Sequence, residues 1–175
     1  MRPQHAVDSL GERLPRRLLG IEGALLKWPN DLLIDGSKVA GILIETVGDM
    51  DSHCQVVIGI GVNVRMPAAA EAAIDQRWSD LQRHLTAPLS RNRLTALLLD
   101  QLVAMLSNFQ QQGFAAFAEA WNQRDLCAGQ PVVIRGLNSA LEGTACGVDS
   151  RGGLQLRTAK GIEVIRSGEV SLRMQ

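Results

Sequence analysis

The stretch KWPNDLLIDGSKVAGILIE, residues 27–45, decides the fold because turn residues interrupt its apolar runs at two places. Pro29 and Asn30 give the first turn signal, since proline fixes φ and asparagine can hydrogen-bond its own backbone. Asp35 and Gly36 give the second, and this pair is preferred in two-residue hairpin loops. The apolar runs around both turns therefore predict antiparallel strands that follow one another along the chain.

The segment CQVVIGIGVNVRM, residues 54–66, extends this meander by a further strand. Its nearly continuous apolar character predicts a strand that is buried on both faces. Residues 68–85 contain good helix formers, and Ser90 is suited to be the N-cap of a second helix. The apolar residues that follow recur at steps of three and four, which predicts buried helix faces rather than a ligand site: Leu94, Leu98, Leu102, Met105 and Phe109, then Phe114, Phe117 and Trp121 in a further helix.

From Pro131 onward the sequence reads as five short strands separated by Gly, Asn, Asp and Ser. Strands of that length and number predict a small, partly closed barrel. The expected fold class is α+β. Residues 1–127 would hold part of a mixed or antiparallel sheet with packed helices, and residues 128–175 would form a separate SH3-like β-barrel.

Composition excludes several classes of protein. The chain of 175 residues is 46% hydrophobic and 21% charged, which is typical of a globular protein. Its 18 basic and 18 acidic residues balance, so no general field attracts DNA, RNA or an anionic membrane. The three cysteines are far apart and form no C-x-x-C pair, which favours a reducing cytoplasm. Neither a signal peptide nor a membrane-spanning apolar run is visible in the sequence.

Lysines and glycines gather on the predicted hairpin and the strand after it. Lys27 and Lys38 would lie on paired strands, and the simplest interpretation is that they face water at strand ends. Gly41, Gly59 and Gly61 favour another interpretation, because glycine inside a strand usually marks a close approach to the backbone. A flat ligand lying on the sheet would use such gaps. The run GIGVN lacks the G-x-G-x-x-G spacing, which rejects a Rossmann phosphate loop.

Four blocks in order resemble the biotin protein ligase family: LLKWPNDLLIDGSKVAGILIE, VVIGIGVNV at 56–64, Trp78, and GEVSLR at 168–173. The resemblance spans roughly residues 21–175. It implies an ATP-dependent enzyme that forms biotinyl-5′-AMP and pyrophosphate and then transfers biotin to a lysine of a biotin carboxyl carrier protein. Biotin and ATP would be the substrates, with Mg²⁺ accompanying the nucleotide.

The resemblance also implies roles for individual residues. Lys38 and Lys27 would be the catalytic cations, Lys38 at the biotin carboxyl end and its adjoining phosphate, Lys27 beside the nucleotide phosphates. Asn30 and Asp31 would bind the triphosphate, with Asp31 also holding Mg²⁺. The remaining implied site residues are Gly41, Leu43, Gly59 and Ile60 along the biotin cleft, and Asn63, Trp78 and Arg173 on the ATP side. Trp78 would stack on adenine, and the alternative is that it only packs an amphipathic helix.

The sequence departs from the family pattern before Lys27. The Ser/Thr-rich strand and the Gly/Arg-rich loop that wrap biotin in the family do not occur, so an N-terminally truncated ligase with impaired activity is expected. The helix-turn-helix of repressor-type members is also absent, which predicts no DNA binding. A sheet that lacks strands exposes an edge, so a homodimer is possible. The alternative function is a non-catalytic fragment or interaction module that uses the C-terminal barrel. It is disfavoured because the last 50 residues contain no aromatic side chain.

Overall fold

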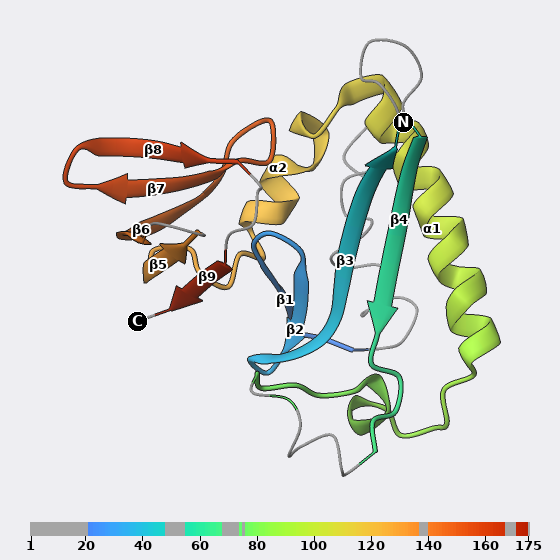
Figure 1. Ribbon diagram of the computed structural model, residues 1–175. Helices are drawn as coiled ribbons and strands as arrows, with labels where there is room; N and C mark the ends of the chain where they lie inside the picture. The colour runs from blue at the N-terminus through green and yellow to red at the C-terminus, as the bar shows by residue number, and fades with distance from the viewer. Residues whose placement is uncertain are drawn as a thin grey trace.

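A four-stranded antiparallel meander forms the first sheet of the computed structural model, with the order β1-β2-β3-β4 (Figure 1). The structure describes residues 21–47, 55–67, 74, 76–136, 140–166 and 171–174. The strands are β1 (Ala24–Lys27), β2 (Asp31–Ile34), β3 (Ser37–Val47) and β4 (Gln55–Val62). The sequence therefore predicted the meander correctly, although every pairing in this sheet is antiparallel and none is of the mixed type that was also considered.

Both predicted turns are present in the first sheet. Lys27 pairs with Asp31, so Trp28, Pro29 and Asn30 form the connection between β1 and β2. Asp35 and Gly36 connect β2 to β3 and both have positive φ, 49° and 71°. Two consecutive left-handed residues give the turn the twist that a two-residue hairpin needs. These turns fix the register that brings β2 against β3.

The prediction that residues 54–66 form a strand buried on both faces is wrong. Val56 and Val57 on β4 are 55% and 53% exposed, and only alternate residues further along are half-buried. The physical reason is that Val56 and Val57 point to opposite faces of the sheet, and the described residues cover neither face at this end of β4. Continuous apolar character indicated a buried strand, but it does not say whether a second layer covers each face.

The described helical segments are η5 (Leu81–His84), α1 (Arg91–Gln112) and α2 (Ala115–Asn122). Ser90 caps α1 as predicted, because its side chain accepts a hydrogen bond from the backbone N–H of Arg93. The helix expected over residues 68–85 is wrong for residues 76–80, which are not helical, and residues 68–73 and 75 lie outside the described part. Residues 77–79 pair with β3 instead: the Lys38 N–H donates to the Arg77 carbonyl, and the Ser79 N–H donates to the Lys38 carbonyl.

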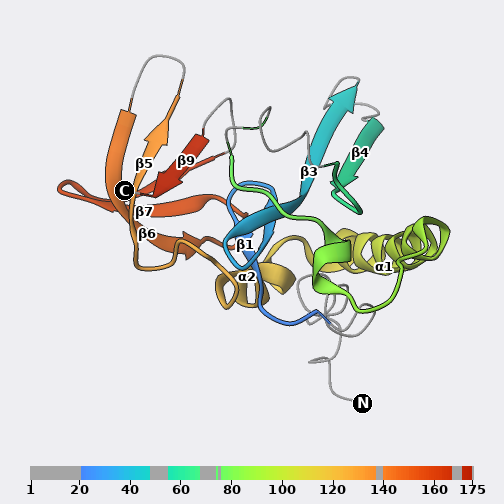
Figure 2. The ribbon, with the colours of Figure 1, turned by 90° about the horizontal axis from the view of Figure 1, so that it is seen from below.

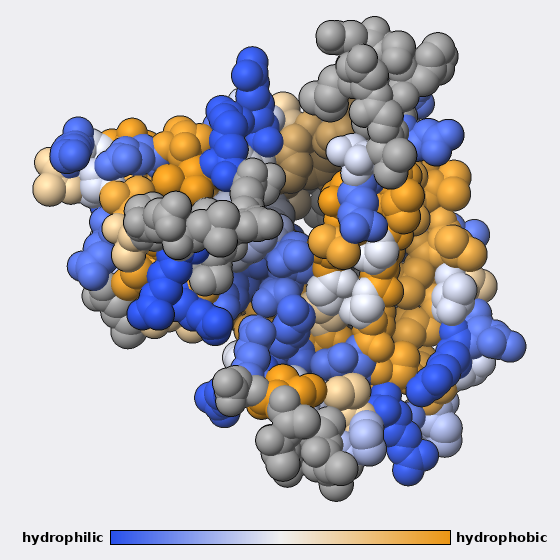
Figure 3. Space-filling model, in the orientation of Figure 1, coloured by the Kyte–Doolittle hydropathy of each residue, from blue (hydrophilic) through white to orange (hydrophobic). Residues whose placement is uncertain are grey.

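The apolar positions of α1 are only partly buried. Leu94 is 5% exposed and belongs to a core cluster with Ile34, Val39 and Leu81, whereas Phe109 is 47% exposed. The helix also carries exposed apolar residues outside the predicted stripe, among them Val103 at 65%. Figure 3 shows apolar side chains gathered over the part of the surface that β3, β4 and α1 form. The predicted core stripe on α1 is therefore confirmed only toward its N-terminal end.

A second antiparallel sheet contains the five strands predicted after Pro131, in the order β8-β7-β6-β5-β9. They are β5 (Pro131–Arg135), β6 (Ala140–Val148), β7 (Leu154–Thr158), β8 (Gly161–Ile165) and β9 (Ser171–Met174). No pairing among these described strands joins β8 to β9, so the sheet is open in the structure rather than closed into a barrel. Its core includes the fully buried Leu154, Leu156, Val132 and Cys127.

The hairpin of β1 and β2 lies between the second sheet and β3 in both ribbon views (Figures 1 and 2). The backbone N–H of Leu26 in β1 donates to the Arg124 carbonyl, and the N–H of Leu126 donates back to the Leu26 carbonyl. The segment that leads from α2 to β5 is thus hydrogen-bonded to the first sheet. Among the helices described, none is long and apolar enough to cross a membrane.

Candidate functional site

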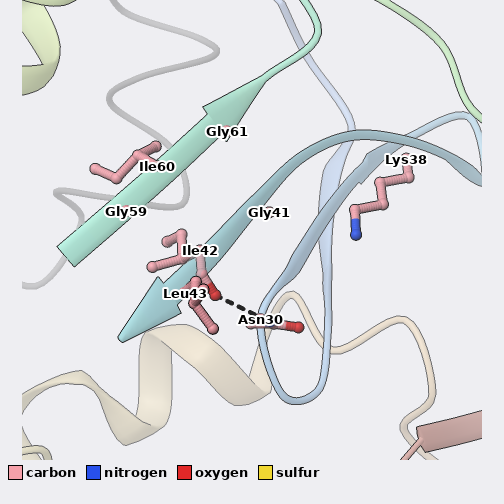
Figure 4. A pocket seen from close by; sticks show the side chains of 8 residues that line it. All are labelled: Asn30, Lys38, Gly41, Ile42, Leu43, Gly59, Ile60 and Gly61. Carbon is pink, nitrogen blue, oxygen red and sulfur yellow. Dashed lines mark hydrogen bonds between the residues drawn. The ribbon is translucent and has the colours of Figure 1, made fainter. Parts of the chain in front are cut away.

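A groove with a volume of about 480 Å³ lies where β3 and β4 pair, beside the turn that precedes β2 (Figure 4). Ligand-binding pockets commonly fall within roughly 300–1,000 Å³. The groove is lined by Asn30, Lys38, Gly41, Ile42, Leu43, Gly59, Ile60 and Gly61. All five residues that were expected to line a biotin cleft are in this set, and Asn30 joins them from the nucleotide side.

The floor of the groove is made of three glycines on two paired strands, Gly41 on β3 and Gly59 and Gly61 on β4. Gly41 pairs with Gly61, and Leu43 pairs with Gly59. A Cβ atom at Gly59 would lie 3.6 Å from the Leu43 carbonyl oxygen, and one at Gly61 would lie 3.7 Å from the Gly41 oxygen. Those are ordinary contacts, so packing against the described residues does not require glycine at either position. The missing side chains leave room above the sheet instead.

Gly41 has a different reason to lack a side chain. A Cβ atom there would lie 3.2 Å from both Cε and Nζ of Lys38, and 3.5 Å from Oδ1 of Asp31. These two residues form an ion pair with 2.5 Å between Nζ and Oδ1, and their side chains are 33% and 14% exposed. The ion pair therefore lies over the bare backbone of Gly41, which places a cation and a carboxylate together at one end of the groove.

Lys38 is held at this place by its backbone as well as by its ion pair. The Asn63 side-chain amide donates to the Lys38 carbonyl at 3.2 Å and to the Ser79 carbonyl at 3.0 Å. Ser79 in turn lies 2.9 Å from Nε2 of His84, whose Nδ1 is 3.8 Å from the Asp35 carboxylate. Asn63 thus ties the strand that carries Lys38 to residues 77–79, and its amide is used within the protein.

Asn30 closes the other side of the groove. Its side-chain amide donates to the Ile42 carbonyl at 2.7 Å, and the Ile42 N–H donates to the Asn30 carbonyl at 3.0 Å. The first of these bonds is drawn in Figure 4. The β1–β2 turn is therefore fastened to the middle of β3 at the lining of the groove. Asp31 follows directly, and its second carboxylate oxygen accepts a bond of 3.4 Å from the Gln76 side chain.

The other expected site residues lie outside the lining of this groove. Lys27 is half-buried at the end of β1. Burial raises the pKa of the Cys127 thiol to about 11, the Asp125 carboxylate adds to that rise, and the Lys27 ammonium opposes it. The charge of Lys27 therefore acts on Cys127, which lies in the core of the second sheet.

Trp78 and Arg173 belong to different parts of the fold, and neither lines the groove. Trp78 forms an isolated bridge with Lys38, and the Arg83 guanidinium carbon lies 4.8 Å from the centroid of its ring. This cation–π contact already uses one face of the indole. Arg173 is exposed on β9, where it pairs with Val133. The structure thus brings Trp78 beside the residue that binds Asp31, but leaves Arg173 on the second sheet.

Sequence reasoning missed several residues of this region. Ile42 lines the groove without having been expected there, and Gly61, which the sequence singled out as a gap in a strand but not as a site residue, lines it as well. Trp28 was quoted within KWPND but received no role, although it is 4% exposed and belongs to the core of the second sheet. No periodic pattern could have found it, because it lies in a turn.

Two family models match the chain. The Biotin/lipoate A/B protein ligase family matches residues 5–63, and the Biotin protein ligase C terminal domain matches residues 128–173. The first match contains the groove residues up to Asn63, and the second contains the five-stranded sheet. This chain belongs to the biotin protein ligase family. The first match also begins earlier than the resemblance found from motifs, in residues that the structure does not describe.

Relatives in the biotin ligase family support the same assignment. The bifunctional ligase/repressor BirA of Escherichia coli K12 is 36% identical over 157 residues, which are 90% of this chain and 49% of BirA. A biotin--[acetyl-CoA-carboxylase] ligase of Paracoccus denitrificans is 34% identical over 83% of this chain and 61% of its own length. The chain thus spans about half to three-fifths of the length of these relatives.

Solved structures agree with the fold. A biotin protein ligase from Aquifex aeolicus superposes with a TM-score of 0.79 and 28% identity, over 97% of this chain and 72% of the other. The same enzyme in complex with biotin and ATP gives a TM-score of 0.78 with 26% identity, over 99% of this chain and 73% of the other. This biotin ligase fold is α+β with antiparallel sheets.

Proposed function

We propose that the groove over β3 and β4 binds biotin and the nucleotide in an ATP-dependent biotin protein ligase reaction. The observation that carries the proposal is the glycine floor with the Lys38 ammonium at its edge. Gly59 and Gly61 leave space that the protein does not need for itself. A compact ring system on a short alkyl chain that ends in a carboxylate fits a bare floor with a cation beside it.

The first step brings two anions together, and the chain supplies positive charge for that purpose. A carboxylate oxygen of biotin attacks the α-phosphorus of ATP. A new oxygen–phosphorus bond forms, the bond to the bridging oxygen breaks, and pyrophosphate leaves. We place the Lys38 ammonium at the carboxylate and the adjoining phosphate, and Lys27 and Asn30 toward the remaining phosphates. Fixed cations in a partly buried site stabilise the charge that develops in the transition state.

The second step is acyl transfer to the carrier protein. The free amine of an acceptor lysine attacks the carbonyl carbon of biotinyl-5′-AMP, the carbon–oxygen bond to phosphate breaks, AMP leaves, and a proton passes to solvent. Lys38 would remain beside the phosphate and stabilise the leaving group. We propose a biotin carboxyl carrier protein as the acceptor, in keeping with the acetyl-CoA-carboxylase ligase from Paracoccus denitrificans.

A single carboxylate beside the groove, that of Asp31, could take part in binding Mg²⁺. Among the described residues, no group of three or more His, Cys, Asp or Glu side chains is placed to hold a metal ion. Mg²⁺ commonly binds through one or two carboxylates together with waters and substrate phosphates. Asp31 supplies such a carboxylate at the end of the groove, and it would share its oxygens between the ion and Lys38. The ion would offset phosphate charge when bound.

The ion pair of Asp31 and Lys38 has a consequence for substrate binding. Lys38 can hold the ligand carboxylate only if its contact with Asp31 loosens or is shared, and a cation beside Asp31 would favour that exchange. We therefore propose that Asp31 would share its carboxylate between Lys38 and a bound metal ion, which would leave the Lys38 ammonium freer to hold the biotin carboxylate.

Several features of the family extend the proposal. The second sheet would act as the SH3-like barrel, and Arg173 on β9 and Trp78 would face the nucleotide. A homodimer would pair β4 with its copy, since β4 lies at an edge of the described sheet. Sedimentation over a concentration series tests the homodimer, and a monomer throughout would contradict it.

We propose that the reaction takes place in the cytoplasm and that the chain does not bind DNA. Salt-sensitive duplex binding by the chain would overturn the latter.

The test of the reaction is incubation of the chain with ATP, Mg²⁺, labelled biotin and a carrier domain. We expect labelled adenylate to form, and Lys38→Ala to lower its rate by about 10²–10³-fold, as expected for loss of a fixed charge-stabilising group. Lys160→Ala is the matched control, because Lys160 is an exposed lysine in the turn between β7 and β8. Equal rates for both variants, or no adenylate from any of them, would contradict the proposal.

A further inference from the structure

Trp28 lies in the turn between two strands of the first sheet, but its side chain packs in the core of the second sheet. It follows β1 directly, yet it is 4% exposed and lies within the hydrophobic core built by β5, β6, β7 and β9. Its indole Nε1 donates a hydrogen bond of 3.1 Å to the carbonyl of Gly152, in the turn before β7. A buried tryptophan whose N–H has a partner is a strong anchor, because it combines large buried area with one directional bond.

The contacts on either side of Trp28 hold the same junction. Leu26, two residues earlier, exchanges two backbone hydrogen bonds of 2.8 Å with Arg124 and Leu126. Asn30, two residues later, exchanges two hydrogen bonds with Ile42 in the groove. Only Pro29 separates the anchored indole from the residue that closes the groove. A shift of Trp28 must therefore move Asn30 and Asp31, because so short a link has few free torsions to absorb it.

We propose that Trp28 is a positioning residue through which the packing of the second sheet sets the geometry of the groove. Its indole fixes the β1–β2 turn, so that Asn30 stays bonded to Ile42 and Asp31 stays opposite Lys38. The inference rests on the proposed function for its catalytic meaning, but its structural content can be measured without any ligand.

The alternative is that Trp28 only adds stability to the second sheet. The two ideas predict different patterns of amide hydrogen exchange. Loss of stability alone opens all slowly exchanging amides together, whereas loss of positioning opens the groove selectively. Three amides with defined acceptors make the comparison possible: Ile42 N–H to Asn30, Asn63 N–H to Val39, and Ala145 N–H to Gln130.

The experiment compares Trp28→Phe with Val132→Ala, which alters the same core at a fully buried position on β5 rather than in the turn. We expect Trp28→Phe to accelerate exchange at Ile42 by about tenfold relative to Asn63 and Ala145, the size expected for one lost hydrogen-bond network. Val132→Ala should change the three amides by similar factors. Equal acceleration at the three amides in Trp28→Phe would overturn the proposal.

A second variant changes Gly152, whose carbonyl accepts the hydrogen bond from the Trp28 indole, and it serves as the test if Trp28→Phe folds poorly. Gly152 has φ of +80°, and an added Cβ would meet the Phe114 ring at an ordinary 3.5 Å. Gly152→Ala therefore strains the backbone that presents the acceptor carbonyl while leaving Trp28 intact. We expect selective acceleration at Ile42, by about threefold or more. If Gly152→Ala instead accelerates exchange at the Ile42 and Ala145 amides by the same factor, the positioning role of Trp28 is contradicted.

A parallel titration separates this inference from the proposed function. If biotinyl-5′-AMP binds, Trp28→Phe should weaken its affinity by about tenfold, and Val132→Ala by less than about twofold. Selective exchange without ligand binding in any variant would support positioning and remove the proposed function. Ligand binding that is unchanged in Trp28→Phe, together with uniform exchange, would remove the positioning role and leave the proposed function intact.

Discussion

Gly59→Ala tests whether the bare floor of the groove exists for a ligand. The new Cβ would lie 3.6 Å from the Leu43 carbonyl oxygen and 3.9 Å from the Leu43 Cβ, so none of the described residues has to move. Replacing glycine by alanine at an unstrained position stabilises a fold by about 0.4–1 kcal/mol through the unfolded state. The melting temperature should therefore stay the same or rise. Any loss of binding then has to come from the groove itself.

The added methyl group would occupy space where the ligand lies against the sheet. Forcing an extra methyl group into a well-packed contact costs about 1–3 kcal/mol. With about 1.4 kcal/mol for each factor of ten, the dissociation constant for biotinyl-5′-AMP should rise about 5- to 150-fold. Isothermal titration calorimetry measures the constant, and thermal unfolding measures stability. Val56→Ala is the control, because this residue of β4 faces away from Gly59 on the strand. An unchanged affinity in Gly59→Ala would refute the reasoning.

Three further predictions concern the rest of the chain. Burial raises the pKa of Asp125 above its ordinary value of 3.8, so ionisation of this carboxyl group destabilises the fold as the pH rises above 3.8. Asp125→Asn should therefore make the urea midpoint of unfolding depend less on pH between pH 3 and 7, and an unchanged dependence would contradict this prediction. Two backbone N–H groups of its own turn lower the pKa of Asp149, so stability should fall as pH drops below 3.8, and Asp149→Ala should abolish that acid-side loss. Ser90→Ala should lower unfolding free energy by about 0.5–2 kcal/mol, whereas no change in chemical denaturation would contradict its role as N-cap of α1.

Local turn chemistry made the meander predictable. Asp35 and Gly36 both adopt the positive φ that their residue types favour, and Ser90 caps the helix that its position indicated. These features depend on a few neighbouring residues, so a single sequence contains the information. The five strands after Pro131 followed from the same kind of signal.

Features that depend on distant parts of the chain were not predictable. The exposure of β4 depends on what covers its faces, and residues 77–79 pair with β3 although their composition suggested a helix. The partnership of Lys38 with Asp31 depends on the register shift between Leu32 and Leu33, which no local pattern encodes. Trp28 packs in the core of the second sheet, whose residues come about a hundred positions later in the chain, so no pattern near Trp28 indicates this contact.

The most direct measurement of the central claim is a titration of the ¹⁵N-labelled chain with biotinyl-5′-AMP, followed through glycine amide resonances. Gly41, Gly59 and Gly61 form the floor of the groove, whereas Gly129 and Gly161 lie away from it with nothing near their Cβ positions. We expect saturable shifts at the three floor glycines and none at Gly129 and Gly161, and we expect Lys38→Ala to weaken the binding. Shifts confined to the second sheet, or binding that Lys38→Ala leaves unchanged, would contradict it.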